Sequence, residues 1–259
     1  MAEKFLTNRI AVVTGGRRGL GKAMALALGE VGAKLALVDN ESSADAVNEA
    51  KAKGIEAKSF TCDVSNAKNV EACAKEIVDH FGKANILINA AGIVIRKTTS
   101  DLSVDEWDRV IGINLSGAFY FSKALIPHMR GHGYGRIINI CSVMAHVSTA
   151  DRVAYNASKA GLLAMTKAQA LELAQDNITV VGISPGAFST DMTAALRADP
   201  ARNATFMDAT PMRRWGEPDE IGKLARYICS PDASYITGTD IVIDGGWLAS
   251  QPAGGSFSQ

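Results

Sequence analysis

The sequence has few cysteines, no long apolar run and no excess charge of either sign, and each shortage excludes a class of protein. The four cysteines show no CxxC spacing, so neither a disulfide framework nor a zinc site is expected. No apolar run reaches the roughly 18 residues of a membrane span. Lysine plus arginine and aspartate plus glutamate balance at 27 each, which leaves no charge imbalance of the kind that binds nucleic acid. We therefore predict reduced core thiols, no bound metal, and neither a nucleic-acid nor a membrane partner.

The N-terminal residues also lack the apolar stretch of a signal peptide, so a cytoplasmic protein is expected. Short strands rich in branched apolar residues alternate with helical stretches, without internal repeats or linkers. Strands are predicted over residues 9–14, 34–39, 55–60, 86–89, 135–142, 179–184 and 240–244. Helices are predicted over residues 22–31, 43–53, 66–81, 103–130, 152–175 and 218–229. This alternation predicts a single α/β domain over residues 1–259, with a doubly wound parallel sheet covered by helices on both faces.

A strand, a glycine-rich loop and a helix follow one another at the start of the chain. The apolar strand 9–14 leads directly into Gly15-Gly-Arg-Arg-Gly-Leu-Gly21, and an apolar helical stretch follows. Glycines let the backbone turn tightly beside a pyrophosphate, and the helix N-terminus presents free N–H groups to it. The spacing differs from the commoner GxGxxG, but the strand and helix on either side favour a dinucleotide-binding loop of the Rossmann type.

Asp39 ends the second predicted strand, 18 residues beyond Gly21, near the spacing of about 20 expected for a ribose-binding carboxylate. A carboxylate at this position accepts hydrogen bonds from the ribose hydroxyls and repels a 2′-phosphate, which favours NAD. Arg17 and Arg18 argue the other way, because guanidinium groups can hold a 2′-phosphate. We give the like-charge repulsion more weight than the two arginines and predict NAD rather than NADP.

Tyr155 and Lys159 lie four residues apart in a helical stretch, and therefore on one helix face. A lysine ammonium beside a phenol lowers the phenol pKa from about 10 towards neutrality. Such a phenol can exchange a proton with an alcohol. The pattern is short, and alone it also fits a surface tyrosine beside an ion-pairing lysine. Ser142, thirteen residues before the tyrosine, adds a hydroxyl that could polarise the same oxygen.

These motifs, in this order, resemble the short-chain dehydrogenase/reductase family over nearly the whole chain. The resemblance implies a catalytic set of Asn114, Ser142, Tyr155 and Lys159. Tyr155 would act as general acid and base, and Ser142 would hydrogen-bond the substrate oxygen. Lys159 would support the phenolate and bind the nicotinamide ribose, while Asn114 would hold a water in a proton relay. No metal is required by this chemistry.

The same resemblance implies how the cofactor is bound. The family's Asn-Asn-Ala-Gly motif is Asn89-Ala-Ala-Gly92 here, and Ala90 in place of the second asparagine weakens the structural role usually given to the motif. The cofactor-binding residues implied are Gly15, Arg17, Arg18, Gly19, Leu20, Gly21, Asp39, Asp63, Val64, Asn89, Ala91, Gly92, Tyr155, Lys159, Pro185, Gly186, Phe188 and Thr190.

The substrate is expected to bind under a mobile lid at about residues 190–215. The lining is predicted to include Phe188, and the substrate-binding residues are predicted to be Arg96, Ser142, Met144, His146, Arg152 and Tyr155. Arginine after the Asn89–Gly92 motif resembles the branch of gluconate 5-dehydrogenase and 2-deoxygluconate 3-dehydrogenase. A buried or half-buried arginine near the catalytic serine suits a carboxylate. We therefore predict NAD-dependent interconversion of a secondary alcohol and a ketone on a sugar acid or related polyhydroxylated substrate.

Three alternatives stay open. A 3-oxoacyl-thioester reductase would use NADPH and a basic docking patch, against which Asp39 and the even charge argue. A steroid or apolar-alcohol dehydrogenase could use an apolar pocket wall formed by Met144, Phe188, Met192, Phe206 and Met207. A non-catalytic dinucleotide-binding regulator should have lost part of the catalytic set, which is complete here.

Oligomeric state rests on the resemblance, which implies a homotetramer or homodimer. Family members pair through two long helices, here 103–130 and 152–175, and often through the last strand and the C-terminal segment. The helix from Ser158 to Ala174 is rich in alanine and leucine on several faces, which suits burial against both its own sheet and a partner. The Gly/Ser/Pro-rich tail 251–259 is expected to be mobile or to pack on a neighbouring subunit.

Overall fold

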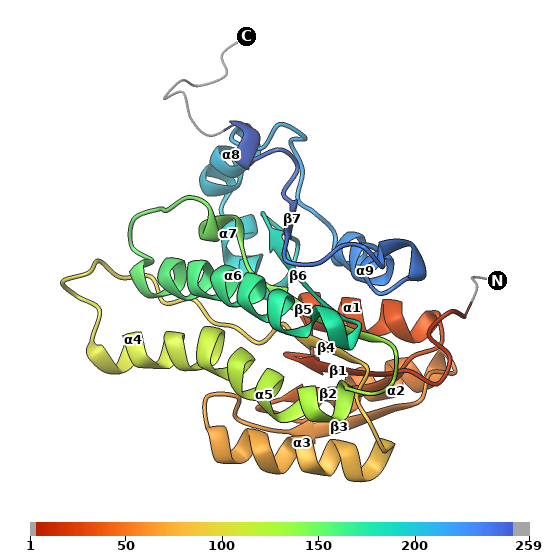
Figure 1. The fold of residues 1–259 in the computed structure, drawn as a ribbon. Coiled ribbons are helices and arrows are strands. Elements are labelled where there is room, and N and C mark those ends of the chain that lie inside the picture. The colour runs from red at the N-terminus through yellow and green to blue at the C-terminus, as the bar shows by residue number, and fades with distance from the viewer. Residues whose placement is uncertain (1–3, 251–259) are drawn as a thin grey trace.

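The structure is a computed structural model, and it describes residues 4–250. Seven strands form one sheet in the order β3-β2-β1-β4-β5-β6-β7, and every pairing between neighbours is parallel (Figure 1). The strands are β1 (Ile10–Thr14), β2 (Lys34–Asp39), β3 (Ala57–Thr61), β4 (Ile86–Asn89), β5 (Gly135–Ile140), β6 (Ile178–Pro185) and β7 (Asp240–Ile243). The predicted doubly wound sheet is therefore confirmed.

Helices cover both faces of this sheet (Figure 1). They are α1 (Gly19–Glu30), α2 (Ala44–Ala52), α3 (Ala67–Phe81), α4 (Val104–Ile111), α5 (Gly117–Met129), α6 (Val153–Leu173), α7 (Ala194–Ala198), α8 (Pro200–Asp208) and α9 (Pro218–Ile228). Side chains alternate along each strand, so Ala11 and Val13 join the core under α1, α2 and α9, whereas Val12 joins the core under α3, α5 and α6. All four cysteines are buried free thiols, which confirms the prediction of reduced core thiols.

The long helix expected over residues 103–130 is interrupted. A π-helical turn, Gly112–Ser116, separates α4 from α5 and carries Asn114, which is 1% exposed. Turns of this kind often mark functional sites. No sequence signal marks this one, because the apolar pattern continues through the turn.

The combined segment Val104–Met129 is the one helix, within residues 4–250, long and apolar enough to cross a membrane by length and composition. The segment meets this criterion by its mean hydropathy, although it contains no uninterrupted apolar run of about 18 residues. Phe121, Leu125 and Met129 are fully buried against the sheet, so in this fold the segment includes a core helix.

Two other regions differ from expectation. Helix α1 begins at Gly19, three residues earlier than the predicted start at Lys22, so the last glycines of the loop form its first turn. The segment expected as a lid contains two short helices, α7 and α8, and the Phe206 ring stacks on Trp215 at a centroid distance of 5.4 Å. The C-terminal tail 251–259, for which mobility or packing on another subunit is expected, lies outside the described residues.

Candidate active site

The strand order reverses at β1: β2 and β3 lie on one side of it, and β4 to β7 lie on the other. The predicted site residues gather at the carboxyl ends of the strands. Gly15 has φ +66°, and a Cβ there would lie 2.9 Å from the Ala91 backbone nitrogen. A Cβ on Gly21 would overlap the Gly15 carbonyl oxygen. Only glycine therefore allows the loop after β1 to pack this closely between β4 and α1.

The first turn of α1 is suited to an anion. Arg18, the residue before the helix, makes no side-chain capping hydrogen bond, and the first turn holds no acidic residue. The N–H groups of this turn thus lack the usual side-chain acceptor, and the helix dipole favours negative charge there. Thr190 comes within 3.9 Å of a Cβ built on Gly19, so the segment after β6 meets the loop here. These features fit the pyrophosphate of a dinucleotide.

The carboxylate of Asp39 lies at the end of β2, with its side chain 13% exposed. It accepts the Arg17 backbone N–H at 3.3 Å, and the Arg17 Nε lies 3.7 Å from its other oxygen. The same guanidinium reaches Glu41 at 3.3 Å, and Arg18 lies 3.4 Å from Asp191. Both arginines that could have held a 2′-phosphate therefore already face carboxylates.

The end of β4 is held by backbone contacts that do not need the asparagine absent at position 90. The Thr14 hydroxyl accepts the N–H groups of Ala90 and Ala91 at 3.1 and 3.2 Å. Asn89 donates to the Asn139 side chain at 2.8 Å in the core. The departure from the family motif consequently leaves this junction intact.

The remaining cofactor candidates surround the same crevice. Asp63 accepts hydrogen bonds from the Ser65 N–H and hydroxyl at 2.9 and 2.7 Å. Val64 is buried against Gly117, and Gly186 lies so close to Asp244 that a Cβ would be 2.6 Å away. Phe188 is 4% exposed and its ring packs on Gly216, which leaves its main chain rather than its ring to face a cofactor.

Lys159 is the buried cation of the site. It is 5% exposed, its Nζ donates to the Ile140 carbonyl at 2.6 Å, and it lies 5.7 Å from the centroid of the Tyr155 ring. No carboxylate within the described part of the chain pairs with it. Its positive charge therefore lies beside the Tyr155 ring, which is half-buried on the same helix face.

Asn114 and Ser142 complete the set predicted to be catalytic. The Asn114 amide bonds both backbone groups of Ile93, at 2.8 and 3.0 Å, and donates to the Ser158 hydroxyl at 3.1 Å. A Cβ on Gly92 would contact both the Asn114 oxygen and the Lys159 Nζ, at 3.4 and 3.6 Å. The Ser142 hydroxyl accepts the Met144 N–H at 3.1 Å, which leaves its own proton to donate.

Two arginines, Arg96 and Arg152, lie in the loops before α4 and α6. The chain segments that carry them are joined by a parallel bridge between Lys97 and Arg152. Burial, and next the neighbouring Arg96, lower the pKa of the half-buried Arg152, while Tyr155 and Asp151 act in the opposite direction. Arg152 is half-buried as expected, but Arg96 is exposed, so the expectation of burial does not extend to it.

The other two predicted substrate ligands are already engaged. Met144 is 7% exposed, and its sulfur lies 3.6 Å from the Thr149 hydroxyl. The His146 Nε2 lies 2.7 Å from an Asp240 oxygen. Sequence reasoning missed Asp240, because an aspartate at the start of a strand carries no motif.

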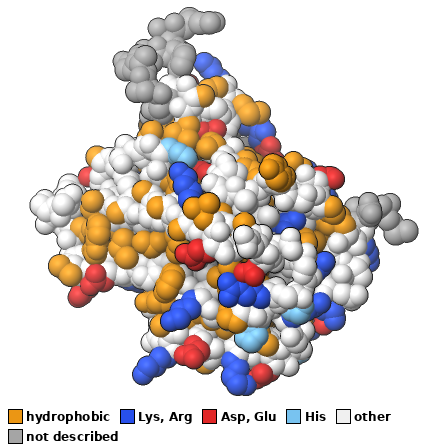
Figure 2. Space-filling view, viewed as in Figure 1, with side chains coloured by type: hydrophobic (Ala, Val, Ile, Leu, Met, Phe, Trp, Pro, Cys, Tyr) orange, Lys and Arg blue, Asp and Glu red, His pale blue; other side chains and the backbone are white. Residues whose placement is uncertain are grey.

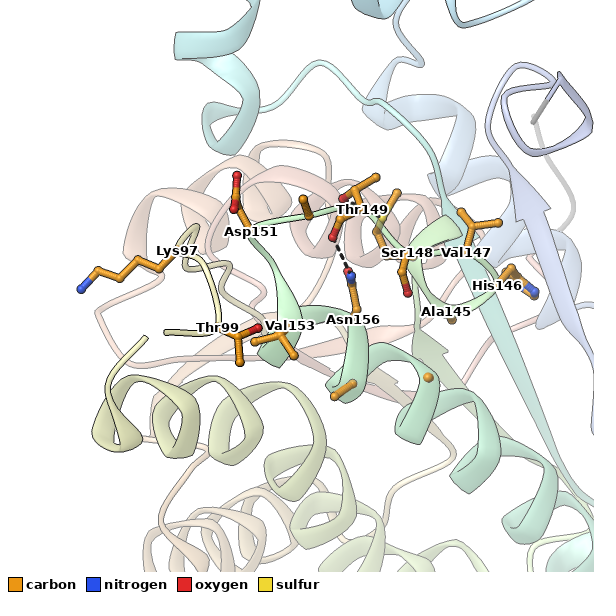
Figure 3. A pocket seen from close by; sticks show the side chains of 14 residues that line it. Lys97, Thr99, Ala145, His146, Val147, Ser148, Thr149, Asp151, Val153 and Asn156 are labelled. Carbon is orange, nitrogen blue, oxygen red and sulfur yellow. Dashed lines mark hydrogen bonds between the residues drawn. The ribbon is translucent and has the colours of Figure 1, made fainter. Parts of the chain in front are cut away.

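A hollow of about 490 Å³ opens beside these loops (Figure 3). Its helical wall consists of Val153, Asn156, Ala157 and Ala160, and Asn156 donates to the Thr149 carbonyl at 3.1 Å. At 3.6 residues per turn, these positions face away from Tyr155. The hollow is therefore separate from the face of α6 that carries Tyr155 and Lys159.

Comparison with known proteins gives a consistent answer. The family model described as enoyl-(acyl carrier protein) reductase matches residues 15–248. The chain is 36% identical over 252 residues to 2-dehydro-3-deoxy-D-gluconate 5-dehydrogenase of Pseudoalteromonas atlantica, covering 96% of this chain and 99% of that protein. It is 38% identical over 247 residues to 3-oxoacyl-[acyl-carrier-protein] reductase of Synechocystis sp., covering 94% and 98%.

Solved structures agree. A protein of Agrobacterium tumefaciens described as a gluconate dehydrogenase is 34% identical, with TM-score 0.92 over 96% of this chain and 99% of that one. Another from the same organism, described as a 2-deoxy-D-gluconate 3-dehydrogenase with bound NADP, is 31% identical, with TM-score 0.89 over 96% and 100%. The chain belongs to the short-chain dehydrogenase/reductase family and is an oxidoreductase that acts on hydroxyl groups with a nicotinamide dinucleotide.

Proposed function

We propose that this protein interconverts a secondary alcohol and a ketone on a sugar acid, with NAD(H) as its cofactor. The observation that carries the proposal is that a bridge between Lys97 and Arg152 brings the segment with Arg96 beside Arg152, which lies one helical turn before Tyr155. Neither guanidinium forms an ion pair with any of residues 4–250. Two like charges held together are relieved by an anion, and a carboxylate suits the planar donors of arginine.

The other site residues supply proton chemistry at the substrate oxygen. In the oxidative direction Tyr155 removes the hydroxyl proton, and Ser142 donates a hydrogen bond to the same oxygen. Lys159 places an unneutralised positive charge beside the Tyr155 ring. Asn114 lies beside Lys159 and can orient a water that returns protons to solvent. The nicotinamide cofactor, when bound, accepts the hydride.

Asp39 supports NAD(H) over NADP(H). Its carboxylate lies at the end of β2, where the adenosine ribose is expected to bind, and a 2′-phosphate there would meet a charge of the same sign. Arg17 compensates for this repulsion only in part, since its guanidinium is shared between Asp39 and Glu41. Similar structures contain bound NADP, and we expect this chain to differ from those proteins in its cofactor preference.

A second candidate is reduction of 3-oxoacyl thioesters, which is supported by similarity to 3-oxoacyl-[acyl-carrier-protein] reductases at 38% identity. Such an enzyme binds an acidic carrier protein, whereas this chain has formal net charge +0. The arginine pair also has no role in binding an apolar acyl chain. We therefore place the sugar-acid activity first.

We also propose a homotetramer or homodimer, and a cytoplasmic location. Large apolar side chains stand exposed on α4, α5 and α6, namely Val104 at 74%, Phe119 at 47% and Leu171 at 84%. Figure 2 shows hydrophobic side chains gathered over this region of the surface. A partner subunit would cover such a patch.

The test is a screen at 340 nm with NAD⁺ and NADP⁺ against aldonates, uronates, neutral polyols and apolar alcohols, with 3-oxoacyl thioesters and NADPH in the reverse direction. We expect NAD⁺-dependent turnover confined to acidic sugars, and its loss in Tyr155→Phe. Turnover only of acyl thioesters or apolar alcohols would contradict the proposal.

A further inference from the structure

His146 and Asp240 form a contact that the chemistry above does not use. The His146 Nε2 lies 2.7 Å from Asp240 Oδ2, with the histidine side chain 32% exposed and the aspartate side chain only 5% exposed. The second aspartate oxygen, Oδ1, is buried and has no hydrogen-bond partner among residues 4–250. A buried carboxylate in such surroundings depends strongly on its one partner.

The neighbouring strand is shaped to admit this carboxylate. Asp240 begins β7 and pairs in register with Gly182 of β6. A Cβ built on Gly182 would overlap Asp240 Oδ1, so any larger residue there would displace the aspartate. Gly182 in β6 and Asp240 in β7 thus form a matched pair that aims the carboxylate at His146.

The contact continues to the catalytic serine. The Ser184 hydroxyl lies 3.4 Å from His146 Nε2 and donates to the Ser142 carbonyl at 3.0 Å. His146 itself ends the short 3₁₀ turn that starts after Ser142, and its N–H donates to the Val143 carbonyl at 3.1 Å. The turn that sets the direction of the Ser142 hydroxyl is therefore tied to β7 through one histidine.

Other polar and charged groups lie around His146. Ser184 is the neighbour from β6, and Lys97 and Asp151 line the hollow that His146 borders (Figure 3). Burial raises the pKa of the Cys141 thiol to about 12, Lys159 opposes this, and Asp240 adds to it. Asp240 and Lys159 therefore both lie within electrostatic reach of the residue that precedes Ser142.

We propose that His146 and Asp240 are positioning residues, whose contact holds the turn after Ser142 against β7 and so fixes the Ser142 hydroxyl for the reaction. This assignment replaces the substrate-binding role predicted for His146, and it rests on the proposed function. Neither residue is expected to touch the substrate. A small displacement of a catalytic hydroxyl is enough to lower a rate markedly.

The test compares His146→Ala, His146→Gln and Asp240→Asn, with His132→Ala as a control because His132 is exposed. Glutamine keeps an N–H donor near the position of Nε2, whereas alanine removes it. With D-gluconate and NAD⁺, we expect His146→Ala and Asp240→Asn to lower kcat by about tenfold to a hundredfold. His146→Gln should recover most of kcat, and KM for NAD⁺ should stay within about twofold in every variant because Asp39 lies at another strand end.

A structural readout separates positioning from general destabilisation. Crystal structures of the wild type and His146→Ala should show the Ser142 hydroxyl displaced in the variant, and if that variant fails to fold, Asp240→Asn takes its place. If the wild type turned over no sugar acid, the proposed function would be refuted but the positioning role would not, because the crystal structures still show where the Ser142 hydroxyl lies. Wild-type kcat in His146→Ala, or an unmoved Ser142, would overturn the positioning role.

Discussion

Replacing Asp39 by asparagine should change the cofactor preference of the enzyme. The side chain keeps its shape but loses its charge at the position where the adenosine ribose is expected to bind. A 2′-phosphate about 4 Å from the carboxylate is repelled by about 4 kcal/mol for each unit charge, at an effective dielectric constant near 20. The Arg17 guanidinium, 3.7 Å from the carboxylate, offsets roughly half of this and leaves about 2 kcal/mol. That difference corresponds to about a 30-fold preference for NAD⁺ in the wild type.

The Asp39→Asn variant should therefore gain about 30-fold in kcat/KM with NADP⁺. It should lose about tenfold with NAD⁺, because hydrogen bonds from the ribose hydroxyls to a charged acceptor become bonds to a neutral one. Initial rates at 340 nm with D-gluconate and each cofactor measure both changes.

Glu41→Gln is the matched control, since Glu41 also reaches Arg17 but its side chain is 62% exposed. Its effect on the cofactor ratio should stay within about threefold, because solvent screens exposed charges. A wild-type enzyme that prefers NADP⁺, or an Asp39→Asn variant with an unchanged cofactor ratio, would refute the role assigned to Asp39.

Three further changes have defined outcomes. Lys159→Met should lower kcat by about 10²-fold or more, because the buried cation beside Tyr155 is lost; an unchanged kcat in initial-rate assays would contradict this role. Tyr134→Phe removes a 2.7 Å hydrogen bond to the Cys229 carbonyl and should cost about 1 kcal/mol of unfolding free energy in urea titrations. Hydrogen bonds from Arg214 hold the pKa of Glu220 at about 2, below its usual 4.5. The ion pair therefore stabilises the fold fully above pH 4.5, and this stabilisation is lost as pH falls towards 2. The Tm deficit of Glu220→Gln should shrink over that range, and a constant deficit would argue against the ion pair.

The fold can be predicted from the sequence because its signals are local and agree with one another. Each strand is a short apolar run between turn residues, and alternation with helices allows few topologies. The motifs also fall at the carboxyl ends of strands, and this alone places Asp39 and Ser142 at the same edge of a parallel sheet. Helix starts are harder to locate, since glycine-rich sequence such as Gly19–Gly21 is typical of a loop but forms the first turn of α1.

The parts that could not be predicted depend on contacts between distant segments. The π-helical turn around Asn114 shifts the helix register without interrupting the apolar pattern. The exposure of Arg96 depends on how its loop pairs with the segment before α6. The partnership of His146 with Asp240 joins residues 94 positions apart, and neither residue lies in a motif that would announce it.

The most direct test of the central claim compares D-gluconate with its neutral counterpart D-glucitol as substrates of the wild type and of Arg152→Ala. Each hydrogen bond between a guanidinium and a carboxylate contributes about 1.5–3 kcal/mol, so kcat/KM of the wild type should favour the acid by about 10- to 100-fold. Arg152→Ala should lose most of that preference through a higher KM for the acid, with turnover of the neutral polyol little changed. Equal use of both substrates by the wild type, or an undiminished preference in Arg152→Ala, would contradict the assignment of the arginine pair to a sugar carboxylate.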